Sequence, residues 1–132
     1  MYLNCHTYYS LRFGTFSEIE LLKMAERNNV KVLALTDINN TSACLNFIRK
    51  SAHHNIRPIV GIDFRNGADQ QFVGLAKNNE GFKELNVFLS HHSHNSIPLP
   101  LEAPLLPETY IIYPFEKVLQ SNKQQFKDNE YI

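Results

Sequence analysis

The chain has 132 residues, which is the length of one domain or of part of one. Its 43% of hydrophobic residues can build a buried core, which excludes a disordered chain. Thirteen basic and thirteen acidic side chains give a formal net charge of zero. The sequence therefore lacks the basic surplus with which proteins hold nucleic-acid backbones, and any such grip is expected to come from another part of the molecule.

Nothing in the sequence indicates a membrane protein or a secreted one. No stretch approaches the roughly 20 apolar residues of a membrane span, and residues 1–4 have neither the basic start nor the apolar run of a signal peptide. The two cysteines, Cys5 and Cys44, lie far apart in apolar runs, so we expect buried, reduced thiols. We expect a cytoplasmic protein with no membrane partner.

The first part of the chain alternates strand and helix signals. A strand is expected over residues 2–6. An S-x-x-E capping box at Ser17 and Glu20 then predicts the start of a helix that ends at residues 28–29. Residues 32–35 are apolar without alternation, which is typical of a strand covered on both faces of a parallel sheet.

A second helix is predicted over residues 41–54, followed by a strand over residues 59–64. The apolar spacing i, i+3, i+7 predicts as the inner face of this helix Leu45, Ile48 and Ala52. The pair Asn66-Gly67 is a strong hairpin signal, so residues 71–76 are expected to return antiparallel to the preceding strand.

A third helix is predicted to begin at Asn78 or Asn79, either of which is a good N-cap. Its apolar stripe is expected at Phe82, Leu85 and Leu89. Residues 97–107 hold four of the six prolines and are interpreted as an extended connector. A strand over residues 109–113 and a weak helix over residues 115–127 follow.

About four β/α units with one β-hairpin predict an α/β fold. So few units cannot close a (β/α) barrel, which takes about 250 residues. We therefore interpret the chain as part of a larger, distorted barrel, with the apolar residues 131–132 starting another strand. Residues 1–95 are expected to form the front part of this barrel, residues 96–108 the connector, and residues 109–132 a further strand and helix of the same domain.

Polar clusters follow three of the predicted strands. The first holds Asn4 and His6 with Ser10, the second holds Asp37 and the third holds Asp63. Because the carboxyl ends of strands converge in a β/α fold, we expect an imidazole, two carboxylates and an amide around one cavity. This donor set suits zinc, manganese or iron more than calcium. Each cluster alone favours a turn over a ligand, and their shared placement makes them a candidate site.

The three clusters resemble the motifs of the PHP (polymerase and histidinol phosphatase) domain family. In that family H-x-H-x-x-x-S follows the first strand, T-D-H the second and G-x-E the third. The corresponding letters here are N-C-H-T-Y-Y-S at residues 4–10, T-D-I at 36–38 and G-I-D at 61–63. The segments I-R-P-I-V-G at 56–61 and L-A-K-N-N-E-G-F at 75–82 resemble the N-terminal PHP segment of the bacterial DNA polymerase III alpha subunit.

The resemblance also implies a weakened metal site. By that match His6 and Asp37 are retained, and Asp63 replaces a longer glutamate. Asn4 stands at a histidine position as a neutral amide, and Ile38 at another cannot coordinate. The loss of two of five ligands should sharply weaken a multinuclear site. We expect no catalytic residue, and either no metal or one weakly held zinc or manganese ion at the residual ligands.

The resemblance implies a part in DNA replication. The parent resembles a DNA-directed DNA polymerase, a transferase of the nucleotidyltransferase kind, whose magnesium ions bind palm carboxylates outside this chain. We interpret the chain as a structural and interaction module that is not catalytic alone. Expected partners are the rest of the alpha subunit and, as in some family members, a proofreading exonuclease subunit, with DNA contacted only indirectly. Two alternatives stay open: an active metal-dependent phosphoesterase (a 3′–5′ exonuclease or pyrophosphatase), and an unrelated β/α protein that folds alone.

Two other groups of side chains have competing interpretations. Three histidines resemble a metal cluster, but their place at a helix end favours contacts with the last carbonyls of that helix: His91, His92 and His94. An aromatic and basic loop has the composition to contact a nucleotide, but packing against a neighbouring domain is the favoured interpretation: Tyr8, Tyr9, Arg12 and Phe13.

Overall fold

The computed structural model describes residues 1–132. The chain divides into two compact units, Met1–Ile62 and Asp63–Ile132, and each unit has its own core. Strand β3, Arg57–Asn66, begins in the first unit and ends in the second. The α-helices are all too short or too polar to cross a bilayer.

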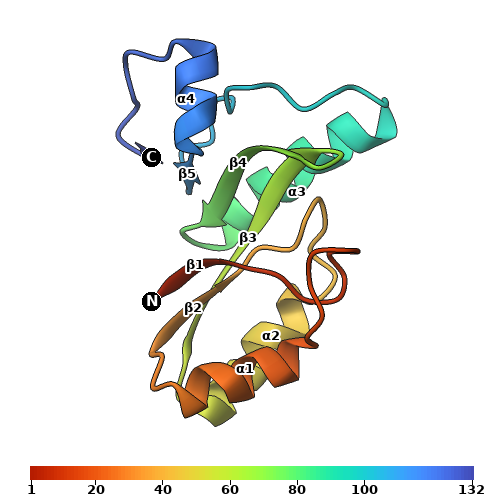
Figure 1. Ribbon diagram of the computed structural model, residues 1–132, viewed down its shortest axis with the longest axis vertical. Coiled ribbons are helices and arrows are strands. Elements are labelled where there is room, and N and C mark those ends of the chain that lie inside the picture. Colours follow the sequence, from red (N-terminus) through yellow and green to blue (C-terminus); the bar gives the residue numbers. More distant parts are fainter. The chain divides into compact units, whose positions relative to one another are not determined.

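The first unit is built on parallel strands (Figure 1). β2, Val32–Leu35, lies between β1, Tyr2–Cys5, and the start of β3, and pairs in parallel with both. Its residues 33–35 are all buried. The predicted strand covered on both faces is therefore confirmed, and the first strand ends one residue earlier than expected.

Two helices pack together in this unit, and their residues meet β2 in one core. α1, Glu18–Arg27, begins with the predicted capping box, in which Ser17 Oγ accepts from the amide of Glu20 and the Glu20 carboxylate accepts from the amide of Ser17. α2, Cys44–Ser51, runs on into a short 3₁₀ turn, Ala52–His54.

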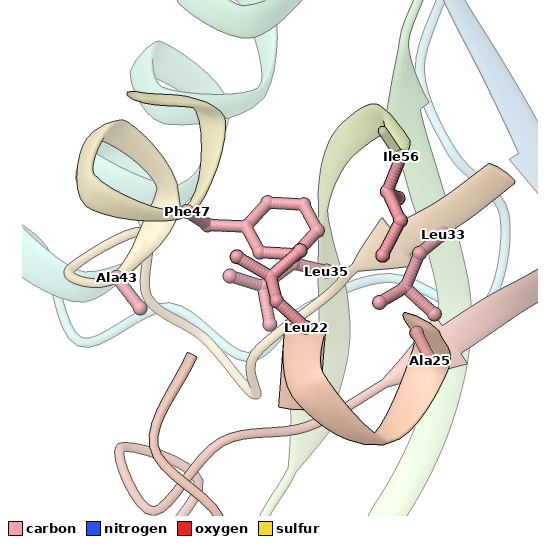
Figure 2. Packing of buried hydrophobic residues seen from close by; sticks show 7 residues of the cluster. All are labelled: Leu22, Ala25, Leu33, Leu35, Ala43, Phe47 and Ile56. Carbon is pink, nitrogen blue, oxygen red and sulfur yellow. The ribbon is translucent and has the colours of Figure 1, made fainter. Parts of the chain in front are cut away.

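The predicted inner face of α2 is wrong. Leu45 is 72% exposed and Ile48 is 41% exposed, and Ala52 is also exposed, whereas Phe47 is fully buried between the helices and the sheet. Figure 2 shows the Phe47 ring beside Leu22 and Leu35. The buried face is Cys44, Phe47 and Ser51. It has the same i, i+3, i+7 spacing as the predicted stripe, so periodicity could not choose between them, and burial of the larger aromatic side chain decided.

The second unit continues from β3 into β4, Asp69–Ala76, β5, Thr109–Ile112, and β6, Glu130–Tyr131. β4 and β5 are antiparallel, and β5 and β6 are parallel. β3 and β4 are neighbours joined by a tight turn in which Gly67 has a φ of 64°, which confirms the predicted hairpin. The strands of each unit form an open sheet, and the predicted α/β fold with one hairpin is confirmed.

Aromatic side chains fill the core of the second unit. α3, Asn79–His94, is capped by Asn78, whose side chain accepts from the amide of Gly81. It brings Phe88 within 5.3 Å of Phe64, measured between ring centroids, and Phe72 lies 4.9 Å from Phe64. α4, Phe115–Ser121, is shorter than predicted, because Asn122 adopts the left-handed conformation (φ 52°) that ends a helix.

The proline-rich segment forms no helix or strand, as predicted, yet it is anchored along its length. The side-chain amide of Asn66 donates to the Leu99 carbonyl and accepts from the Leu99 amide, both at 2.9 Å. The Tyr113 hydroxyl accepts from the amide of Ala103 at 3.0 Å. Because Leu99 and Ala103 are also buried, the segment is a packed part of the second unit.

Candidate functional site

The first two predicted polar clusters meet at one edge of the first unit. β1 and β2 are parallel neighbours, so their carboxyl ends lie side by side. The Thr36 amide donates to the Cys5 carbonyl at 2.9 Å, and the Thr36 hydroxyl donates to Asn4 Oδ1 at 2.7 Å. The Asn4 amide oxygen thus links the two strands, and half-buried His6 follows it at the end of β1.

Asp37 lies at the centre of this edge, and it is only 1% exposed. Its Oδ1 accepts from the Thr7 amide at 2.7 Å and from the Ser10 hydroxyl at 2.6 Å. Its Oδ2 accepts from the Thr7 hydroxyl at 2.7 Å. Three of the roughly four lone-pair sites of a carboxylate are therefore taken by donors from the loop after β1.

Ile38 takes part in the same edge through its backbone. Its amide donates to the Ser10 hydroxyl oxygen at 2.9 Å. The Ser10 hydroxyl therefore receives a hydrogen bond from Ile38 while it donates one to Asp37. The aliphatic side chain of Ile38 has no atom that can bind a metal. Besides its amide, this position contributes its backbone carbonyl, which accepts from the Asn40 side-chain amide at 3.0 Å.

The negative charge of Asp37 also affects the pKa of Cys44 at the start of α2. Burial raises the pKa of the Cys44 thiol to about 12, and the nearby Asp37 carboxylate adds to the effect. A thiol with such a pKa stays protonated at neutral pH, and only the thiolate is a good metal ligand or nucleophile. Cys44 is buried as predicted, whereas Cys5 is half-buried, and both are free.

Asp63, the third predicted ligand, belongs to the second unit and is fully buried. Its Oδ2 accepts from the guanidinium of Arg65, with Nη2 at 2.8 Å and Nε at 3.1 Å. Its Oδ1 accepts from the Gln70 amide at 3.0 Å. Both oxygens therefore have partners from the β3–β4 hairpin.

The donor atoms needed for a metal centre are thus largely engaged within the protein. Each oxygen of Asp37 and of Asp63 accepts at least one hydrogen bond. No group of three His, Cys, Asp or Glu side chains is arranged to hold an ion. Metal binding by His6, Asp37 and Asp63 stays a prediction.

One of the three histidines at the end of α3, His92, contacts backbone carbonyls. His92 Nδ1 lies 3.2 Å from the Ile97 carbonyl oxygen and 3.1 Å from that of Pro98. Its ring packs on Phe88 with a centroid distance of 4.5 Å. These carbonyls belong to the loop after the helix, whereas the sequence favoured the last carbonyls of the helix itself.

The loop after β1 carries a cluster of exposed apolar side chains. Tyr8 and Tyr9 lie 4.7 Å apart, measured between ring centroids, and each is almost half exposed. Leu11 is 81% exposed, and Phe13 and Phe16 are 48% and 41% exposed. We call this segment, residues 8–16, the aromatic loop. Sequence reasoning anticipated its composition.

Two residues that shape this loop were missed from the sequence. Thr7 donates twice to Asp37, and Gly14 lies so close to the Thr7 carbonyl that a Cβ atom on Gly14 would stand 1.9 Å from the oxygen. Two signals were available. Short hydroxyl residues flank the loop after β1, and an aspartate ends the neighbouring strand, so donors and acceptor were near one another in the predicted fold.

The comparison with known protein families decides the family of the chain. The family described as the PHP domain matches residues 3–129. The chain belongs to the PHP domain family.

Relatives of this PHP domain are alpha subunits of DNA polymerase III. The chain is 39% identical over 83 residues to "DNA polymerase III subunit alpha" of Ureaplasma parvum serovar 3, a match that covers 63% of this chain and 8% of the relative. It is 35% identical over 99 residues to the protein of the same name in Staphylococcus aureus strain Mu50, covering 73% of this chain and 9% of that protein. The PHP domain therefore spans less than a tenth of these relatives, and the predicted resemblance is confirmed.

A solved structure confirms the fold. The PHP domain is similar to a putative metal-dependent phosphoesterase from Bifidobacterium adolescentis, with a TM-score of 0.55 over 70% of this chain and 33% of that one. The sequence identity is 13%, so this likeness concerns the fold alone.

Proposed function

We propose that this PHP domain is the front part of the PHP region of a DNA polymerase III alpha subunit, acting in DNA replication. In that setting it serves as a structural and interaction module, and its metal site is degenerate. The domain is not catalytic alone. One observation carries the proposal: the Asp37 carboxylate, retained at a motif position, has both oxygens engaged by Thr7 and Ser10.

The residues at the other motif positions support the same conclusion. Asn4 offers a neutral amide oxygen that already accepts from Thr36, and Ile38 offers no ligand atom. Asp63 is neutralised by Arg65 at 2.8 Å. An ion bound by either carboxylate would have to displace hydrogen bonds that this buried group already accepts, which is costly. We infer that the site holds no ion, or one weakly held zinc or manganese ion.

The interaction role is supported by exposed apolar side chains in the aromatic loop. Leu11 at 81% exposure and Phe13 at 48% lie close in sequence to Tyr8 and Tyr9. Exposed apolar groups clustered in this way mark contact surfaces in proteins. We propose that the partners are the rest of the alpha subunit and a proofreading exonuclease subunit.

Catalysis by the whole protein is proposed to reside elsewhere. The relatives are polymerase subunits of which this domain spans less than a tenth. A polymerase binds magnesium through palm carboxylates to transfer nucleotides, and we place those carboxylates outside this chain. Contacts of this domain with DNA would then be indirect, which agrees with a formal net charge of zero.

Elemental analysis of the purified chain, followed by assays with added manganese, tests the proposal. We expect clearly less than about one ion of zinc or manganese per chain. We also expect no turnover of phosphodiester or pyrophosphate substrates. Tightly bound metal in stoichiometric amount together with phosphoesterase turnover would overturn the proposal in favour of an active metal-dependent phosphoesterase.

A histidine double variant, Asn4→His with Ile38→His, tests the motif assignment itself. It is expected to bind more zinc or manganese than the parent chain, because it restores imidazoles at the two degenerate positions. The matched control is Leu45→His with Leu105→His, which adds two histidines at positions that are both 72% exposed. Equal binding by the two double variants would contradict the assignment of Asn4 and Ile38 to the site.

A further inference from the structure

A closed set of hydrogen bonds joins the loop after β1 to the end of β2. Thr7 and Ser10 supply three donors to Asp37, at 2.6–2.7 Å. The Ser10 hydroxyl oxygen in turn accepts a hydrogen bond from the Ile38 amide at 2.9 Å. The loop after β1 and the end of β2 therefore each donate and accept hydrogen bonds. Hydrogen bonds to a carboxylate are short and stronger than bonds between neutral groups.

The three side chains of this set are buried. Thr7 is 0% exposed, and Ser10 and Asp37 are each 1% exposed. Water cannot readily replace a lost partner at such positions, so removing one group leaves another buried and unsatisfied. We therefore expect these hydrogen bonds to form and break together. They join two chain segments that lie about 30 residues apart in the sequence.

The turn after Ser10 is wrapped around the same set. The Ser10 carbonyl accepts from the amides of Phe13 and Gly14, both at 2.9 Å. Gly14 approaches the Thr7 carbonyl so closely that no Cβ atom would fit without a backbone shift. Farther along, the amide of Tyr8 donates to the Phe16 carbonyl at 2.8 Å, which closes the loop. The exposed side chains of the aromatic loop are thus carried on an ordered backbone.

We propose that Thr7, Ser10 and Asp37 form a metal-independent clasp that fixes the aromatic loop to the end of β2. A metal ion bound by side chains from several strand ends would tie these segments together through its ligands. Here proton donors occupy the Asp37 oxygens instead, so the segments are tied without an ion. The clasp holds the exposed aromatic side chains in one arrangement and makes Asp37 a positioning residue.

The clasp rests on this network and stands independently of the proposed function. A chain that bound metal elsewhere and hydrolysed phosphoesters would overturn the proposed function and leave the clasp in place. Conversely, a loop held by an ion would overturn the clasp even if no phosphoesterase activity were found. Amide hydrogen exchange, measured residue by residue by NMR, separates these outcomes.

In the parent chain we expect slow exchange at the amides of Thr7 and Ile38, which donate to side chains and not to a strand partner. Ser10→Ala removes the acceptor of Ile38 and one donor to Asp37. Exchange at both amides should accelerate roughly tenfold or more, because local opening no longer breaks these bonds. The control is Ser42→Ala, which removes an exposed hydroxyl from the same unit and should leave both rates unchanged.

Removal of metal ions by a chelator tests, in the unmodified protein, whether an ion holds the loop. With EDTA present, exchange at Thr7 and Ile38 should match that of the untreated chain. Faster exchange at these amides after chelation would show that an ion holds the loop and would overturn the clasp. Unchanged exchange in Ser10→Ala would overturn it as well.

Should Ser10→Ala fail to fold, Thr7→Val provides the second variant, because it keeps the side-chain shape and the backbone donor. It removes the hydroxyl that donates to Asp37 and accepts from the Tyr9 amide at 3.3 Å. Exchange at Tyr9 and Thr7 should then accelerate, while the core amide of Leu35 keeps its rate. Parent-like exchange at both Tyr9 and Thr7 would contradict the clasp.

Discussion

Arg65 and Asp63 lie two residues apart on β3, and the Arg65 Nη2 atom is 2.8 Å from Asp63 Oδ2. Side chains at i and i+2 share one face of a strand, so the pairing follows from local geometry. The Asp63 side chain is 0% exposed and the Arg65 side chain is 12% exposed. The pair places a positive charge beside a carboxylate that the sequence predicts as a metal ligand.

The free energy of unfolding should reveal how much Asp63 depends on this pairing. Arg65→Met leaves the buried carboxylate without its neutralising partner, which typically costs about 3–5 kcal/mol. Urea unfolding at neutral pH measures the loss. Arg49→Met is the matched control, because Arg49 is exposed and its guanidinium contacts only the Asn46 amide oxygen at 3.4 Å. A loss for Arg65→Met no larger than for this control would contradict a stabilising role for the pair.

Acidification should weaken the second unit through Glu130. Burial acts to raise the pKa of this carboxyl group, but hydrogen bonds from the Lys127 amide and from the Lys123 and Tyr113 side chains outweigh it. The net pKa lies below the ordinary value of 4.5. A carboxyl group with a lowered pKa in the folded state stabilises the fold above its unfolded pKa, and this contribution is lost as pH falls through its folded pKa.

The free energy of unfolding should therefore fall as the pH drops below the ordinary carboxyl pKa of 4.5 and through the lower folded pKa, and Glu130→Gln should reduce that fall. Urea titrations at several pH values, compared between the two proteins, give the measurement. Glu116→Gln is the control, because Glu116 is exposed and its removal should leave the pH profile nearly unchanged. Identical profiles for Glu130→Gln and the parent chain would contradict the role given to Glu130.

The two faces of α2 should respond very differently to truncation. Phe47 is 0% exposed in the core of the first unit, and Phe47→Ala should cost about 3–5 kcal/mol of unfolding free energy through lost burial and a cavity. Leu45→Ala, on the face that the apolar spacing predicted to be inside, should cost no more than about 0.5 kcal/mol, because Leu45 is 72% exposed. Equal losses would contradict the burial of Phe47 and the exposure of Leu45 on which this prediction rests.

Elements defined by neighbouring residues could be predicted from the sequence. The capping box of Ser17 and Glu20 involves residues three apart, and the Asn66-Gly67 hairpin depends on the φ of 64° that glycine adopts readily. The resemblance of residues 4–10 and 36–38 to the family motifs could likewise be recognised from the amino-acid sequence. Each of these features depends on interactions within a few residues, which the order of the letters specifies.

The packing face of α2 and the partners of Asp37 could not be predicted in the same way. Two stripes on α2 have the same spacing, and only contact with β2 and α1 selects the one that contains Phe47. The donors to Asp37 come from Thr7 and Ser10, 30 and 27 residues away, and are oriented by the turn around Gly14. Such contacts depend on the approach of distant segments, which periodicity does not encode.

The sequence by itself determined the order of strands and helices, the hairpin and the family resemblance, because each depends on residue types within short segments of the chain. Only the tertiary structure decided what the remaining site residues contact. It placed the Asp37 carboxylate among the donors of Thr7 and Ser10, and the Asp63 carboxylate against Arg65. The physical reason is that a buried carboxylate requires partners for its charge and its lone pairs. Which groups supply them depends on how the chain brings its segments together.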